Sequence, residues 1–126
     1  MVQKRDNQEK IRLGQWGENC ACEYLVGQGM SLIGRNVRSP YGEIDLIMKK
    51  ERLTVFVEVK TRSNAGNGYP EDAITPEKIK HLDDCAHWYI DEHPDIGDNW
   101  RVDVITIIGR PGNRVTPIID WWQNEF

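Results

Sequence analysis

The hydrophobic and polar residues of one segment alternate in a way that predicts a β-strand. Valine occupies every second position over 55–59, and this places Phe56, Glu58 and Lys60 on the opposite face. The segment is apolar enough to lie in the interior of a sheet. Glu58 and Lys60 are therefore expected to emerge side by side from a central strand.

A second apolar segment, over 43–48, precedes this strand and is separated from it by a turn over 49–52. If the two strands pair antiparallel around that turn, residues whose numbers sum to about 101 to 103 face each other. Asp45 then lies opposite the region of Val57 and Glu58, within reach of the Glu58 carboxylate. Strand alternation is taken to send Glu43 to the opposite face, so we expect Glu43 to be structural.

The rest of the pattern predicts two helices and three more strands. In chain order, the expected elements are a helix over 8–27, strands over 30–36, 43–48 and 53–62, a helix over 76–92, and strands over 100–108 and 114–118. Asn7 is the expected cap of the first helix, and Thr75 followed by Pro76 begins the second. Residues 120–126 are expected to form an aromatic-rich tail.

This order predicts a fold of the α/β class. A strand, a helix and a strand in succession make the third and fourth strands parallel, whereas the short turns between the first three make those antiparallel. We therefore expect one domain over residues 1–126, with residues 1–6 frayed, built on a mixed five-stranded sheet with a helix on each side in the order α-β-β-β-α-β-β. Gly14 and Gly17 are poor helix residues, so they predict the close approach of another backbone to the first helix.

Composition and charge narrow the class of protein. The 126 residues are 39% hydrophobic and 29% charged, with three cysteines and no apolar run long enough to cross a membrane. We expect a cytoplasmic protein with free thiols and no membrane association. The formal net charge is −4, but residues 1–62 carry 11 basic against 8 acidic side chains. A basic half is compatible with a nucleic-acid partner.

The acidic residues of the predicted hairpin suggest a metal site. Carboxylate oxygens such as those of Asp45 and Glu58 are ligands of Mg²⁺ or Mn²⁺ rather than of zinc. An ion held there could activate water against a phosphodiester, and Lys60 could orient that water or stabilise the charge that develops. Arg62 could hold a flanking phosphate. The alternative is a surface ladder in which Glu58 pairs with a cross-strand lysine and Asp45 belongs to the turn.

The same residues resemble a known nuclease motif. Asp45, twelve intervening residues and then Glu58-x-Lys60 resemble the PD-(D/E)xK motif, with Ile44 where that motif has proline. Together with Gly17-Glu18, the run Gly42–Ile47 and the run Phe56–Arg62, the chain resembles the YraN family of small bacterial predicted endonucleases. The order of acids is also similar to that of archaeal Holliday-junction resolvases.

The resemblance implies a restriction-endonuclease-like core. It implies Asp45 and Glu58 as metal ligands, Lys60 as the catalytic lysine, and Glu18 as a further acid and ligand reaching the site from the first helix. Thr61 and Arg62 belong to the same motif and are expected, with Lys78, to contact nucleic acid.

Other residues carry weaker signals. Lys78 on the second helix is a candidate for phosphate contact, although a solvated lysine is the default, and the loop over 64–70 could clamp a DNA backbone or be an ordinary connection. Asp103 is expected to bond within the sheet or to pair with Arg101. The histidines at 81, 87 and 93 are expected at the surface, and the paired tryptophans at 121 and 122 mainly in packing.

Two functions follow from these observations. The first is a Mg²⁺- or Mn²⁺-dependent endonuclease acting on branched or otherwise structured DNA, with a homodimer as the form needed to resolve a junction. The second is a non-catalytic module that binds nucleic acid or a protein partner with a nuclease-like core.

Overall fold

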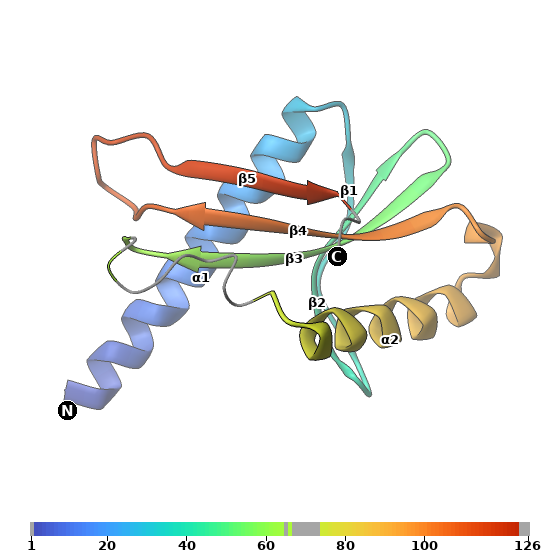
Figure 1. Cartoon of the computed structure of the whole chain (residues 1–126), viewed down its shortest axis with the longest axis horizontal. Helices are drawn as coiled ribbons and strands as arrows, with labels where there is room; N and C mark the ends of the chain where they lie inside the picture. The colour runs from blue at the N-terminus through green and yellow to red at the C-terminus, as the bar shows by residue number, and fades with distance from the viewer. Residues whose placement is uncertain (1, 65, 67–73, 124–126) are drawn as a thin grey trace.

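The computed structural model describes residues 2–64, 66 and 74–123 and contains a mixed five-stranded sheet with a helix packed on each face (Figure 1). The elements are α1 (Val2–Gly27), β1 (Ser31–Ser39), β2 (Gly42–Lys50), β3 (Leu53–Arg62), α2 (Pro76–Glu92), the 3-10 helix η3 (Pro94–Ile96), β4 (Trp100–Ile108) and β5 (Ile118–Gln123). This confirms the predicted fold class and element order, and it is consistent with a restriction-endonuclease-like core.

The strands lie side by side in the order β1-β2-β3-β4-β5. Only β3 and β4 pair parallel, and they are the two strands joined through α2; the other neighbouring pairs are antiparallel. The reason is the length of the connection, because a parallel pair needs a crossover and a tight turn can join only antiparallel strands. The predicted orientations of the first four strands are therefore confirmed.

The register between β2 and β3 is also as predicted. Leu46 faces Val57 and Lys50 faces Leu53, so the numbers of facing residues sum to a value within the expected range. The chain reverses at the turn after Lys50, where Glu51 has a positive φ of 56°. This register directs Asp45 toward the part of β3 that carries Glu58.

Alternation along β3 divides the core into two layers. Val55 and Val57 pack on the face covered by α1, and Phe56 packs on the face covered by α2. The α1 layer contains, besides these valines, the buried residues Ala21, Leu25, Met30, Leu46, Met48, Ile105 and Ile107. The α2 layer contains Ile44, Ile47, Phe56, Leu82, Cys85, Ala86 and Val102. The apolar stripes of both helices thus pack against the sheet as their sequences indicate.

The ends of the helices agree only in part with the prediction. α2 begins at Pro76, with the Thr75 side chain accepting a hydrogen bond from the Lys78 amide at 3.2 Å, and it ends before His93 as expected. The prediction of a cap at Asn7 is wrong, because α1 already begins at Val2. Gln, Lys and Arg, which fill most of the preceding positions, are strong helix formers, so nothing in the sequence stops the helix there. Over the residues described, neither helix is both long and apolar enough to cross a membrane.

The last strand lies later in the chain than predicted. Residues 114–117 are not a strand, and β5 runs from Ile118 to Gln123, into the segment expected to be an aromatic tail. Pro117 has no amide hydrogen to donate to a ladder, so pairing with β4 begins only after it. β1 likewise extends to Ser39, three residues past its expected end.

Side-chain hydrogen bonds hold β5 to β4. The indole of Trp121 donates to Asp103 at 2.8 Å, and the indole of Trp122 donates to Thr106 at 3.0 Å. The fully buried Asp103 also pairs with Arg101 at 3.0 Å, which confirms that expectation. All three histidines are exposed as predicted. Most of the loop over 64–70 lies outside the described residues, and its role stays a prediction.

Candidate active site

A cleft of about 1130 Å³ opens where α1 passes the C-terminal ends of β3 and β4. In Figure 1 the N-terminal half of α1 extends past the same end of the sheet at which the β3 and β4 arrows end. The residues lining the cleft are Glu9, Lys10, Arg12, Leu13, Gly14, Glu18, Asp45, Glu58, Val59, Lys60, Thr61, Arg62, Ser63, Arg110 and Pro111. Six of the seven residues predicted to form the site are among them.

Asp45 lies where β2 separates from β3. The backbone ladder between these strands begins at Leu46, and one residue earlier the Asp45 carboxylate accepts a hydrogen bond from the Val59 amide at 2.8 Å. The alternation of β2 slips at the same point, because Ile44 and Ile47, three residues apart, both pack in the α2 layer. The side chain of Asp45 thus accepts the hydrogen bond that a backbone carbonyl would accept if the β2–β3 ladder continued. It lies where the gap between the two strands begins.

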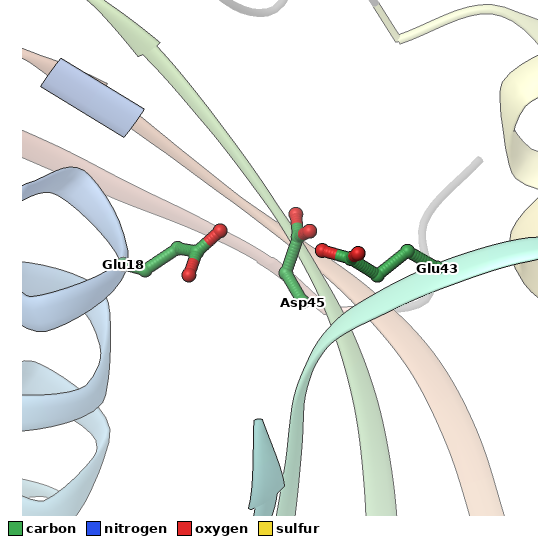
Figure 2. A group of neighbouring side chains, drawn as sticks. All are labelled: Glu18, Glu43 and Asp45. Atoms are coloured by element: carbon green, nitrogen blue, oxygen red, sulfur yellow. The ribbon is translucent and has the colours of Figure 1, made fainter. Parts of the chain in front are cut away.

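Three carboxylates converge beside this gap. One oxygen from each of Glu18, Glu43 and Asp45 lies within 4.8 Å of the corresponding oxygen of the other two, among the residues that the structure describes. Figure 2 shows Glu18 reaching from α1 and Glu43 from β2, both directed toward Asp45. The acid on the first helix and the acid on the second strand are therefore brought together, as the resemblance implied for Glu18.

The expected position of Glu43 is wrong. It was placed on the face opposite Asp45, but residues two positions apart in a strand project to the same face. The Glu43 carboxylate accordingly joins the group with Glu18 and Asp45. The spacing of Glu43 and Asp45 in the sequence was sufficient to predict this.

Burial and neighbouring charge make Asp45 an unusual acid. Enclosure by the protein, and then the charges of Glu58 and Glu18, raise the pKa of Asp45 to about 7, although the hydrogen bond from Val59 and the charge of Lys60 act in the opposite direction. A site that disfavours its own negative charge in this way favours a bound cation, because a cation relieves the repulsion among the acids.

Glu58 and Lys60 lie next to this group rather than within it. Their side chains form an ion pair at 3.2 Å, and both are largely shielded from solvent. Lys78, from the first turn of α2, does not line the cleft; it lies close enough to Lys60 for that ammonium to lower the pKa of Lys78. The structure thus brings Glu58 close to Asp45, but the tightest set of acids contains Glu43 in its place.

The position of α1 depends on Gly17. A Cβ on Gly17 would collide with the Oγ1 of Thr61 and lie 3.0 Å from its Cβ, so only glycine lets the helix approach β3 this closely. The close approach predicted from Gly17 is therefore present, but its partner is the side chain of Thr61 and not another backbone. Thr61 is thus a packing residue of the cleft wall. For Gly14 the prediction is wrong, because an added Cβ would meet nothing within 4 Å. Gly14 lines the cleft itself.

Two residues of β1 that the sequence analysis did not single out contact the acids. The amide nitrogen of Asn36 donates to Glu18 and to Glu43, each at 3.0 Å, and the guanidinium of Arg35 lies 3.4 Å from Glu18. Asn36 has a positive φ of 52°. A signal was present in the sequence, since asparagine is uncommon inside strands and is among the residues that tolerate this conformation.

The donor set of the three converged carboxylates, of which Glu18 and Asp45 also line the cleft, fits a hard divalent cation. Among the described residues, the convergent group consists of carboxylates alone, with neither histidine nor cysteine, and such oxygen ligands suit Mg²⁺ or Mn²⁺. Glu18, Glu43 and Asp45 are the residues that could hold the ion.

Comparison with known proteins identifies relatives along most of the chain. Residues 17–107 match the model of the family described as "Uncharacterised protein family UPF0102". The chain is 39% identical over 99 residues to a UPF0102 protein of Syntrophotalea carbinolica, covering 79% of this chain and 80% of the relative. It is 38% identical over 118 residues to a UPF0102 protein of Nocardia farcinica, covering 94% of this chain and 91% of that one.

The matched range includes Glu18, Glu43, Asp45 and Glu58 and extends over most of the sheet. The family-level resemblance seen in the sequence is therefore confirmed, and the chain belongs to the UPF0102 (YraN) family.

Proposed function

We propose that this protein is a divalent-metal-dependent endonuclease that hydrolyses phosphodiester bonds in DNA. One observation carries the proposal: Glu18, Asp45, Glu58 and Lys60, which come from three different elements, all line one open cleft. The alternative interpretation of the hairpin is a surface ladder with unrelated charges. It gives no reason for Glu18 on α1 to lie beside the charged residues of the hairpin.

Each of these residues has a role that its position supports. Glu18, Glu43 and Asp45 would hold the cation through their carboxylate oxygens. When bound, a divalent cation stabilises charge at the scissile phosphate and acidifies the water that attacks it. Lys60 pairs with Glu58 at 3.2 Å, and its ammonium would stabilise the charge that grows on the phosphate oxygens.

The walls of the cleft suit a polyanion. Lys10 and Arg12 on α1, Arg62 at the end of β3 and Arg110 after β4 place positive charge around the acidic centre. The overall net charge of −4 does not describe this local surface. Arg and Lys side chains around a metal centre are the usual means of holding the phosphates that flank the scissile bond.

Branched or otherwise structured DNA is the substrate that we favour. The cleft is formed within one small α/β unit, which leaves little surface for reading a long base sequence, so recognition by shape is the more economical mode. Resolution of a four-way junction requires two cuts, and a homodimer would supply the two active sites.

Cleavage assays with a matched pair of variants test the proposal. Wild-type protein with Mg²⁺ or Mn²⁺ is expected to cleave branched DNA in preference to linear duplex, and Lys60→Ala is expected to lower the rate by about 100-fold or more. Lys80→Ala is the control, because Lys80 is exposed on α2 and pairs with Asp84 at 3.2 Å outside the cleft. Cleavage unchanged in Lys60→Ala would identify a contaminating nuclease.

Thermal melting separates an enzyme site from a non-catalytic module. Millimolar Mn²⁺ is expected to raise the Tm of the wild type and to leave that of Asp45→Asn unchanged, because ligands that bind only the folded state stabilise it. Absence of a Tm shift in the wild type would favour a module that binds nucleic acid or a partner protein without cutting.

A further inference from the structure

We propose that Asn36 is a positioning residue for the metal site, and that its side-chain amide holds Glu18 and Glu43 in the arrangement that receives the cation. The inference rests on the proposed metal-dependent function. It adds a residue from a third strand to a centre built by α1, β2 and β3.

The amide of Asn36 connects the two glutamates directly. Its nitrogen donates at 3.0 Å to the Oε1 of Glu18 and at 3.0 Å to the Oε1 of Glu43. An amide group has two N–H donors, so both bonds can form at once. In each glutamate, these bonds leave the Oε2 atom out of the bridge. The Oε2 of Glu43 lies 3.9 Å from the Nε of the exposed Arg38, which is beyond hydrogen-bond distance, so each carboxylate keeps an oxygen for a ligand.

The backbone places Asn36 next to the third acid. In the pairing of β1 with β2, Arg35 faces Leu46 and Val37 faces Ile44, so Asn36 occupies the β1 position across from Asp45. Its φ of 52° is a left-handed conformation within a strand. Asn and Gly adopt this conformation more readily than other residues, which explains how asparagine can stand here.

In the metal-free protein, the Asn36 bridge reduces the electrostatic repulsion among the acids of the site. Glu18 and Glu43 are acids held within a few ångströms of each other and of Asp45, and like charges at this separation repel. A donor shared by the two outer acids offsets that repulsion and keeps them converged. The Arg35 guanidinium lies 3.4 Å from the same Oε1 of Glu18 and 2.6 Å from the Asn19 side-chain oxygen, so it also restrains this glutamate.

Replacing Asn36 with glycine tests the contribution of the side-chain amide independently of the backbone conformation. Asn36→Gly removes the donor, and glycine adopts the positive φ without strain. We expect the Kd for Mn²⁺, measured by titration calorimetry, to rise by about 10- to 100-fold, as for other partners that orient metal ligands. The Tm of the metal-free protein should change little. Glu51→Gly is the matched control, because Glu51 also has a positive φ, of 56°, but lies in the turn between β2 and β3.

A second measurement detects the bridge without metal. In NMR spectra of the metal-free protein, the side-chain amide resonances of Asn36 should shift in both Glu18→Gln and Glu43→Gln, and they should not shift in Glu51→Gly. Equal Mn²⁺ affinity of Asn36→Gly and wild type would overturn the inference and leave the proposed function intact. Absence of Mn²⁺ binding by the wild type would overturn both, even if the NMR shifts showed the bridge to be present.

Discussion

At the scale of single residues, Asp45 combines a structural and a chemical role. Its carboxylate accepts the Val59 amide at the point where the β2–β3 ladder ends, which anchors the diverging strand. The same position surrounds it with Glu18 and Glu58, and burial together with these charges raises the pKa of Asp45 to about 7. Asp45, which fixes the local geometry, is therefore also the acid whose charged form a bound cation would stabilise most.

Neutralising Asp45 should stabilise the metal-free protein at alkaline pH. Because the pKa of Asp45 is higher in the folded than in the unfolded state, stability decreases as the pH rises from about 4 through about 7. Asp45→Asn keeps an acceptor oxygen for Val59 and removes this penalty. With chelator present, the stabilisation of the variant should be larger at pH 8 than at pH 5 by about 2 kcal/mol or less, since solvent at the open cleft screens part of the effect.

Urea unfolding at the two pH values measures this difference. Asp120→Asn is the control, because Asp120 is exposed on β5 and its replacement should have the same small effect at both pH values. A stabilisation by Asp45→Asn that did not change with pH would contradict the raised pKa.

Protons and metal should compete at the same residue. Below about pH 7 the carboxyl of Asp45 must lose its proton before it can act as a ligand, so Mn²⁺ affinity should rise as the pH rises and level off above about 7. The expected change is at most about tenfold per pH unit for one released proton. Calorimetric titrations between pH 5.5 and 8 would measure it, and an affinity independent of pH would argue against Asp45 as a ligand.

At the scale of elements, the site depends on how closely α1 approaches β3. Gly17 provides that approach by leaving room for the Thr61 side chain, and Glu18, the next residue along the helix, then reaches the acids on β2. Hydrophobic contacts of Trp16, Ala21 and Leu25 with the sheet hold the rest of the helix. The position of Glu18 is thus set by packing between two elements far apart in the sequence.

A pair of glycine substitutions tests this packing. Gly17→Ala should destabilise the protein by about 1–3 kcal/mol, because the collision with Thr61 outweighs the gain in helix propensity. Gly14→Ala, where an added Cβ meets open space in the same helix, should stabilise it by up to about 1 kcal/mol. Chemical denaturation would measure both, and Thr61→Ala should restore part of the stability lost in Gly17→Ala. Equal changes in the free energy of unfolding for Gly17→Ala and Gly14→Ala would show that the contact of Gly17 with Thr61 does not affect stability.

At the scale of the whole molecule, charge is distributed unevenly around the cleft. Glu18, Asp45 and Glu58 line the cleft together with basic side chains from α1, the end of β3 and the segment after β4. Glu9 on α1 also lines it, beside Lys10 and Arg12. A divalent ion at the centre would offset the acidic charge and leave a positive surface. The whole-chain charge of −4 would then have little influence on binding at this surface.

Removal of these wall cations should weaken DNA binding without altering sequence preference. Arg12→Ala and Arg110→Ala are each expected to lower affinity for DNA and to reduce the salt dependence of binding by about one released counterion. Lys49→Ala, which removes a cation at the far end of β2, is the control. Fluorescence anisotropy in Ca²⁺ at several salt concentrations would measure these effects. Loss of affinity in Lys49→Ala as large as in the cleft variants would contradict binding in the cleft.

The sequence alone determined the elements and most of the sheet. Alternation over 55–60 identified β3 and its two faces, the short turn after Lys50 fixed the β2–β3 register, and the length of the α2 segment made β3 and β4 parallel. These features are local, because periodicity, caps and connection lengths depend on neighbours in the chain. The weakest prediction was β5, whose start depends on Pro117 and on pairing with β4.

Only the tertiary structure decided how the site is assembled. The sequence placed Glu18 on a helix and Asp45 on a strand, but their separation depends on the contact of Gly17 with Thr61 and on the point where β2 leaves β3. The bridge by Asn36 depends in the same way on pairing between β1 and β2. Distances between side chains on different elements are set by packing, and no periodicity along a single chain encodes them.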